Sequence, residues 1–250
     1  MTTIATRSPA DVAAHIAATI DDIFAMIDGW RDLLQDRLGA ADALAAASVD
    51  PLVEAFAVPA VSGQTLLTGA GFVATPGVLT DAEWHLAWWL GGSGAGRHLR
   101  RLATIDDPGH EQFRDYTALE WWRVPAQTRA RHLTGPYVDY VCTDDYTVTI
   151  TTPVMVHGEM VGVVGADALV DRLERELLPV LRTGRTPATV VNASGRVVTS
   201  TDARREPGSI LRGPGIVEAV RGAGPDAVTL ADGTSVLVCG DTSLALVVGL

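Results

Sequence analysis

The sequence contains no lysine: all 19 of its basic residues are arginines. Schiff-base catalysis, pyridoxal-phosphate chemistry and the phosphate-binding P-loop each need a lysine, so these classes are excluded. The 30 acidic residues give a formal net charge of −11 and a sequence pI of about 4.9. Such a chain is a poor candidate for a basic nucleic-acid surface, and its acidic balance suits cationic or neutral ligands instead.

Cysteine is also scarce, and its spacing carries no motif. Cys142 and Cys239 lie far apart and form no CxxC pair, so we expect reduced thiols rather than a redox centre. The six histidines form no HxH or HExxH pair. The sequence therefore predicts neither a metal site nor a cofactor.

Long apolar runs are absent as well. No stretch of about 18 uncharged apolar residues occurs, so no membrane span is predicted. The segment Met1–Ala10 lacks the basic and then apolar order of a secretory signal. With 47% hydrophobic and 20% charged residues, the sequence predicts a globular protein in the cytoplasm, with one large domain or two small ones.

A long amphipathic helix is predicted at the N-terminus. Ser8 and Pro9 form a typical helix start, and the helix could continue through an alanine-rich stretch to Ala47. Its apolar stripe packs on the protein's own core, or part of it also serves a homodimer. The stripe recurs every three or four residues, at Val12, Ile16, Ile20, Ile23, Ile27, Trp30, Leu34 and Leu38.

The remainder of the chain alternates between strand patterns and turns. Asp232-Gly233 and the residues around His157-Gly158 are typical of hairpin turns. Sequential hairpins favour antiparallel sheets and an α+β fold. The predicted strands are 65–75, 84–90, 98–105, 145–156, 160–166, 189–191, 196–200, 228–230, 235–239 and 244–248, with helices over 170–181 and 216–220.

Three segments follow from this pattern. They are an N-terminal helical spine over residues 1–50, a larger module over 51–185 and a smaller module over 186–250.

Each candidate catalytic motif in the sequence lacks at least one required residue. The glycine-rich run Gly91–Gly96 lacks the GxGxxG order, and we interpret it as a hairpin turn. Ser93 has a glycine two residues before it but Ala95 two residues after it, which breaks the nucleophile-elbow pattern. His110, His132 and the pair Asp144-Asp145 have no partners in sequence. No acid, base and nucleophile come together, so the chain is predicted to be non-catalytic.

One segment combines aromatic and acidic residues in a pattern that suits a cation. Aromatic faces attract ammonium groups, and a carboxylate neutralises their charge. In an extended Tyr-x-Asp, the side chains of Tyr137 and Asp139 share one face. A carboxylate at Asp167, which ends an apolar strand, must be hydrogen-bonded or face a pocket. The candidate ligand-binding residues are Tyr116, Glu120, Trp121, Trp122, Arg123, Tyr137, Asp139 and Asp167.

These motifs resemble the ligand-binding module of a double Cache (dCache) sensor domain. The resemblance rests on 116–122, 134–139, 151–154 and 158–167. Gly69–Val73 resembles the first strand of the distal module, and Val190–Val198 the opening hairpin of the proximal one. The resemblance implies a long N-terminal helix followed by two PAS-like antiparallel-sheet modules, with the ligand in the distal pocket. Most such sensors lie between membrane helices, which this sequence lacks.

The resemblance also implies a ligand class. Members that bind amino acids grip the ligand carboxylate through the arginine of an Arg-x-Trp-Tyr motif, and aligned on Trp121-Trp122 that position is Leu119. Arg123 could substitute, but strand alternation would place it opposite Glu120. The ammonium-binding positions are retained at Tyr116 and Asp167, which favours an amine over an α-amino acid.

The sequence thus predicts a non-catalytic, cytoplasmic small-molecule sensor of the Cache type. Its ligand would be a small amine; the alternatives are a small carboxylate or amino acid bound through Arg123, or an interaction protein whose pocket is vestigial. The predicted partners are the ligand, a second copy through the N-terminal helix and a regulatory protein.

Overall fold

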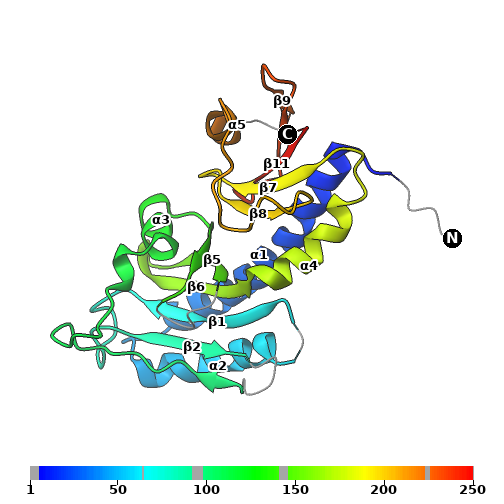
Figure 1. Ribbon diagram of the computed structural model, residues 1–250. Coiled ribbons are helices and arrows are strands. Elements are labelled where there is room, and N and C mark those ends of the chain that lie inside the picture. Colours follow the sequence, from blue (N-terminus) through cyan, green and yellow to red (C-terminus); the bar gives the residue numbers. More distant parts are fainter. Residues whose placement is uncertain (1–5, 64, 92–97, 141–145, 223–225, 250) are drawn as a thin grey trace. The chain divides into compact units, whose positions relative to one another are not determined.

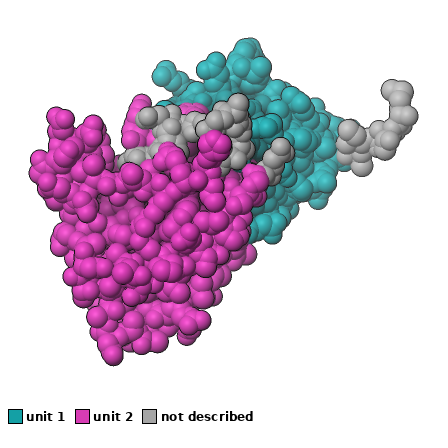
Figure 2. All heavy atoms as spheres, turned by 90° about the horizontal axis from the view of Figure 1, so that it is seen from below, with its two compact units in different colours: residues 1–23, 135–138, 170–250 teal, residues 24–134, 139–169 magenta. Residues whose placement is uncertain are grey.

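The computed structural model describes residues 6–63, 65–91, 98–140, 146–222 and 226–249. The chain divides into two compact units (Figure 2). Unit 1 comprises residues 1–23, 135–138 and 170–250, and unit 2 comprises residues 24–134 and 139–169. The predicted boundaries at residues 50 and 185 stay a prediction.

Unit 2 is built on a six-stranded sheet in the order β3-β2-β1-β6-β5-β4 (Figure 1). Its central strands pair antiparallel: β1 pairs with β2 and β6, and β6 with β5. The strands are β1 (Leu67–Ala74), β2 (Leu86–Leu90), β3 (Arg100–Arg101), β4 (His132–Val138), β5 (Tyr146–Val156) and β6 (Glu159–Leu169).

The hairpin between β5 and β6 turns where the sequence predicts it. His157 and Gly158 both have positive φ, at 52° and 85°, as a two-residue hairpin turn requires. Both strands are buried along almost their whole length, and so is β1. A strand buried on both faces reads as a continuous apolar run rather than as an alternation.

Helices complete unit 2. The helix α2 (Ala46–Val61) packs against β1 and β2, and α3 (Glu120–Thr128) packs against β5 and follows the short 3-10 helix η1 (Tyr116–Ala118). The Asp81 carboxylate caps α2 by accepting hydrogen bonds from the N–H groups of Ala46 and Ala47. The capping residue lies 35 positions away in the sequence, so no local sequence pattern predicts this cap.

Unit 1 contains a five-stranded sheet in the order β8-β7-β11-β10-β9. All its pairings are antiparallel. The helix α4 (Val170–Leu181) packs against β8, and α5 (Ile216–Gly222) packs against β10. The strands are β7 (Ala188–Asn192), β8 (Val197–Ser200), β9 (Val228–Thr229), β10 (Ser235–Val238) and β11 (Leu244–Val248).

The α+β class, with a long N-terminal helix followed by antiparallel sheets, is confirmed. The helix α1 (Pro9–Gly39) begins at the predicted residue, and its apolar stripe is buried at most positions. Trp30 is only half-buried and stacks on Phe56, with ring centroids 4.9 Å apart.

Two element predictions were wrong in extent. The first helix ends at Gly39 and does not continue to Ala47, and the strand predicted over 98–105 is only two residues long. The turn predicted at Gly91–Gly96, with Ser93, lies largely outside the described residues, as do Cys142 and Asp144-Asp145. Cys239 is a buried free thiol, and burial raises its pKa to about 12.

Candidate functional site

Asp167 lies near the end of β6 between two neighbouring strands. It is opposite Thr149 on β5 and Gly69 on β1. The side chain is 4% exposed, and the Thr149 hydroxyl donates to its Oδ1 at 2.6 Å. Among the described residues Oδ2 has no hydrogen-bond partner, and the nearby indole Nε1 of Trp88 has none either. Half of this buried carboxylate is therefore left without a donor.

Gly69 allows the carboxylate and the indole to lie directly against the backbone of β1. A Cβ atom added to Gly69 would lie 2.6 Å from Asp167 Oδ2 and 2.7 Å from Trp88 Nε1. Contacts under 3 Å would force one of these groups to move. The glycine of β1, the indole of β2 and the carboxylate of β6 thus meet at one position in the sheet.

The electrostatics of Asp167 are those of a carboxylate removed from water. Burial and, to a smaller extent, the charge of Asp139 raise its pKa to about 7, against the lowering effect of the Thr149 hydroxyl and the nearby Trp88 indole. Asp139 is itself only 2% exposed. Two predicted site residues therefore form a buried acidic pair, which a cation would stabilise.

An aromatic cluster around Tyr116 brings together three more predicted residues. The Tyr116 ring lies 6.4 Å from that of Trp121 and 5.3 Å from that of Trp122, and the edge contact of Trp84 is 5.1 Å away. The Tyr116 hydroxyl donates to the carbonyl oxygen of Ala74 at 2.7 Å. Burial raises the pKa of Tyr116 to about 12, so it stays a neutral donor.

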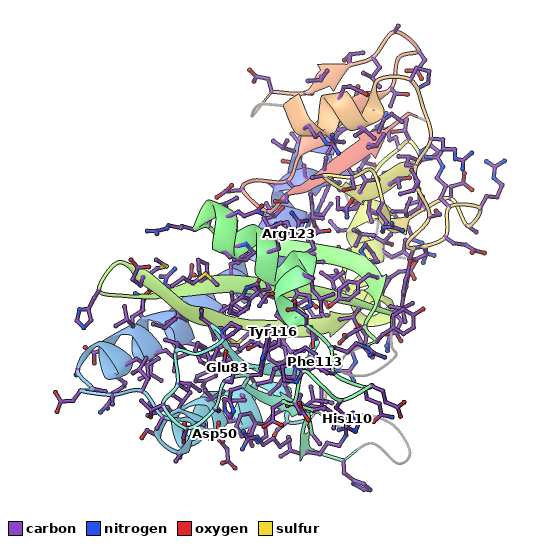
Figure 3. All side chains as sticks on the ribbon, turned by 90° about the vertical axis from the view of Figure 1, so that its left-hand side faces the viewer. Asp50, Glu83, His110, Phe113, Tyr116 and Arg123 are labelled. Atoms are coloured by element: carbon purple, nitrogen blue, oxygen red, sulfur yellow. The ribbon has the colours of Figure 1, made fainter. Side chains whose placement is uncertain are left out.

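Glu120 and Arg123 lie apart from this buried cluster. They stand three residues apart on α3, a helix and not an extended segment, so the predicted alternation is wrong and the two share a face. Both are exposed, and Glu120 contacts His132 Nε2 at 3.0 Å. In Figure 3, Arg123 lies above α3 and Tyr116 lies below it.

Tyr137 is half-buried in β4. It belongs to the short segment 135–138 that groups with unit 1, and its part in the site stays a prediction.

A polar cavity of about 290 Å³ opens beside Tyr116. The sequence does not predict this cavity, because most of its lining comes from a segment without regular structure. Loop residues contribute Asp106, Phe113 and Arg114, and Tyr140 contributes a side chain that is 76% exposed. The guanidinium of Arg114 donates to two carbonyl oxygens of its own loop. Figure 3 shows Phe113 and Tyr116 side by side at this place.

A second missed contact lies away from the acidic pair. His85 Nε2 lies 2.7 Å from Asp50 Oδ1, and Arg101 binds the other oxygen of the same carboxylate at 2.6 Å. Asp50 lies in α2, Arg101 lies in β3, and His85 directly precedes β2. The contact links the helix to the edge of the sheet, and among the described residues no group of three metal-binding side chains is found.

Part of the chain matches a known protein family. Residues 102–175, which include most of the predicted site, match the family model "Methyl-accepting chemotaxis protein-like, first PDC sensor domain". No curated protein sequence matches the chain.

Solved structures match over almost the whole chain. "Methyl-accepting Chemotaxis protein X" has a TM-score of 0.65 at 16% identity, covering 96% of this chain and 93% of that one. The ligand-binding domain of the Pseudomonas aeruginosa amino acid chemoreceptor PctC, in complex with GABA, has a TM-score of 0.52 at 15% identity, covering 95% and 94%. The sensory domain of the Campylobacter jejuni chemoreceptor Tlp3, with isoleucine bound, has a TM-score of 0.53 at 14% identity, covering 96% and 90%.

These matches identify the class of protein: the chain has the fold of a double Cache, or double PDC, sensor domain, as the resemblance predicted. The family model that matches residues 102–175 describes a sensor domain, and two of these solved structures are a ligand-binding and a sensory domain of chemoreceptors. Within the described residues, no helix is long and apolar enough to cross a membrane.

Proposed function

We propose that this chain is a small-molecule sensor whose ligand carries an ammonium group, held by Asp139 and Asp167. The proposal rests on one observation above all: Asp167 Oδ2 is buried and has no hydrogen-bond donor among the described residues. An unpaired buried carboxylate oxygen costs free energy, on the order of 1–3 kcal/mol or more for a charged group. A ligand ammonium group would supply both the missing donor and the opposite charge.

The surroundings of Asp167 suit an ammonium group. The negative charge of Asp139 adds to the attraction, and Tyr116, Trp121 and Trp122 provide the aromatic surface nearby. The absent side chain at Gly69 lets Asp167 Oδ2 and Trp88 Nε1 lie against the backbone of β1. An amine would enter as a cation and leave the acidic pair ionised.

An amino acid is the second candidate ligand. It is favoured by the structural neighbours, since PctC was solved with GABA and Tlp3 with isoleucine. Such a ligand would need a partner for its carboxylate. Leu119 cannot provide one, and Arg123 is exposed on α3. Arg114, which lines the cavity beside Tyr116, is the arginine whose position fits that role better.

Three ligands of matched length distinguish these candidates by calorimetry. Butylamine carries only the ammonium group, butyrate only the carboxylate, and γ-aminobutyrate both. The amine proposal expects heat of binding from butylamine that Asp167→Asn abolishes, and none from butyrate. Asp22→Asn, which removes an exposed carboxylate of α1, is the charge-matched control. Binding of γ-aminobutyrate without butylamine would select the amino acid alternative, and binding of butyrate alone would contradict both.

The cytoplasmic location, the homodimer and the regulatory partner remain part of this proposal. A ligand changes the output of a sensor only if it binds two states with different affinity. The stripe of α1 is mostly buried, so a homodimer would use exposed positions such as Met26 and Leu33, which are 37% and 38% exposed. Sedimentation velocity with and without butylamine tests the homodimer, and a monomer under both conditions would rule it out.

A further inference from the structure

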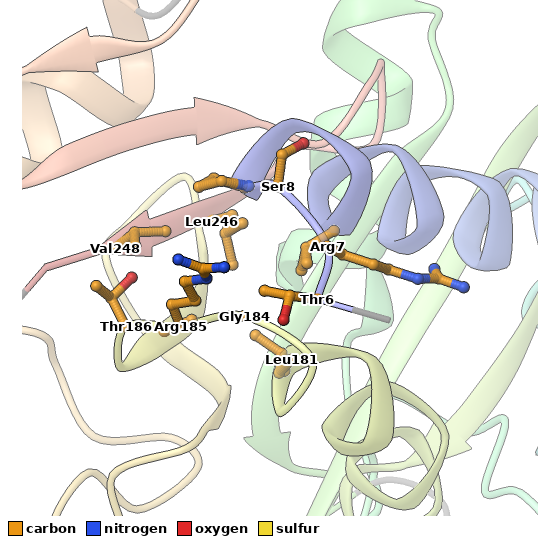
Figure 4. Close-up of a pocket in the computed structure, with 12 residues that line it drawn as sticks. Thr6, Arg7, Ser8, Leu181, Gly184, Arg185, Thr186, Leu246 and Val248 are labelled. Carbon is orange, nitrogen blue, oxygen red and sulfur yellow. The ribbon is translucent and has the colours of Figure 1, made fainter. Parts of the chain in front are cut away.

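A second cavity lies within unit 1, whereas the acidic pair belongs to unit 2. Its volume is about 440 Å³, within the range of roughly 300–1,000 Å³ that small-molecule sites occupy. The wall is formed by the start of α1, the segment that joins α4 to β7, and β11 (Figure 4). All of its described lining residues belong to unit 1.

The floor of this cavity is apolar. Val12, Leu181 and Leu246 line it and are themselves 2%, 0% and 1% exposed, and Ala188 and Val248 complete the floor. An apolar floor favours a ligand that brings a hydrocarbon group, because burial of apolar surface contributes roughly 25 cal/mol per Å².

The charge at this cavity comes from arginine. Of its described lining residues, Arg7 and Arg185 are charged, and both are positive. Figure 4 shows the Arg185 side chain turned toward Leu246 and Val248, whereas the Arg7 guanidinium extends to the other side. The backbone N–H of Arg7 donates to the carbonyl oxygen of Thr183, and this hydrogen bond holds the segment before α1 at the edge of the cavity.

Arg185 is exposed and has no counter-ion among the described residues. No carboxylate of the described residues lies within ion-pair distance of it, in a protein whose net charge is −11. Arg7 forms no ion pair with a described residue either, but Asp11 lies near it: hydrogen bonds with Ser8 chiefly lower the pKa of Asp11, and the charge of Arg7 contributes least. The first turn of α1 is already capped, since Ser8 Oγ accepts from the N–H of Asp11. A ligand would therefore find its charge partner at Arg185.

We infer that this cavity binds a small organic anion with an apolar tail, with the anionic group at Arg185 and the tail over Val12, Leu181 and Leu246. The size of the tail follows from the volume. If each heavy atom takes the roughly 30 Å³ of a water molecule in the liquid, the cavity holds on the order of ten to fifteen heavy atoms. A carboxylate with a chain of about eight carbons fits this volume. This site is separate from the amine site and does not depend on it.

Calorimetry with sodium octanoate on the full chain, at low ionic strength, tests the inference. Octanoate is expected to bind, while octanol and octylammonium, which have the same chain and no negative charge, bind at least about tenfold more weakly. Arg185→Gln should weaken octanoate to a similar extent. Arg182→Gln is the matched control, because Arg182 is an exposed arginine close by that does not line the cavity.

Independent readouts keep the two sites distinguishable. Octanoate affinity should fall as salt is added and should be unchanged by Asp167→Asn. Equal binding of octanol and octanoate, or equal affinity of Arg185→Gln and the unmodified chain, overturns the anion site. So does a dimer in sedimentation velocity that excludes octanoate, because a second copy would then cover the cavity.

Discussion

Replacing Asp167 by asparagine should make the ligand-free protein more stable at neutral and higher pH. The folded-state pKa is raised from the ordinary 3.8 to about 7, so the folded protein binds the extra proton between these values. The contribution of Asp167 to the free energy of unfolding is fully present below pH 4 and is lost as the pH rises through about 7. The shift corresponds to roughly 4 kcal/mol above pH 7, at about 1.4 kcal/mol per pKa unit.

Asparagine removes this loss because it stays neutral. The Thr149 hydroxyl can donate to the amide oxygen or accept from the amide nitrogen, so the existing hydrogen bond has a replacement. We expect Asp167→Asn to gain about 2–4 kcal/mol at pH 8 and about 1–2 kcal/mol at pH 5, where part of the loss has already occurred. For a chain of this length, such a gain raises Tm by roughly 5–15 °C.

Thermal unfolding followed by circular dichroism from pH 5 to pH 8.5 measures this difference. The unmodified protein should lose stability with rising pH more steeply than Asp167→Asn, and the exposed control Asp22→Asn should follow the unmodified protein. Addition of butylamine at pH 8 should stabilise the unmodified protein but not Asp167→Asn. Parallel Tm curves for the unmodified protein and Asp167→Asn across this range would refute the electrostatic argument.

Three further substitutions test the packing that surrounds the two sites. Gly69→Ala should destabilise the protein by about 1–3 kcal/mol and abolish amine binding, because the added Cβ would lie 2.6 Å from Asp167 Oδ2. In the same urea titration, the control Gly29→Ala should leave the stability unchanged, since nothing lies within 4 Å of its Cβ position. Tyr116→Phe leaves a buried strand carbonyl without its donor and should cost about 1–2 kcal/mol, and an unchanged urea midpoint would contradict the assignment. Asn192→Ala removes three hydrogen bonds to backbone groups of unit 1 and should cost about 2–4 kcal/mol, measured by calorimetric unfolding.

Most of the fold could be predicted because the local patterns are strong. The 3.6-residue stripe of α1 and the helical spacing of α4 each describe one buried face. The glycines at 158, 195 and 233 all have positive φ, so the turns they mark follow from the residue type. The order of the strands is less local, and there the resemblance to the dCache family added what periodicity could not.

The errors of prediction have physical causes as well. The alanine-rich stretch after Gly39 has high helix propensity, yet a distant carboxylate, Asp81, caps a new helix at Ala46. The segment 120–128 has few β-branched residues and forms a short helix that contains Pro125, whereas the alternation assumed for Glu120 and Arg123 is that of an extended chain. As a result, the sequence placed Glu120 and Arg123 on opposite faces, although a helical turn brings them together.

The pairing of Gly69, Trp88 and Asp167 could not be predicted, because it depends on the register of three strands that are distant in sequence. In the ligand-free protein this arrangement is unfavourable, since a neutral side chain at Asp167 would avoid the desolvation of a charge. Replacement of buried charges by neutral groups often stabilises proteins. The buried acid is therefore poorly explained by stability alone, and the proposed cationic ligand accounts for its presence. The expected gain in stability of Asp167→Asn and its loss of amine binding are two consequences of this single arrangement.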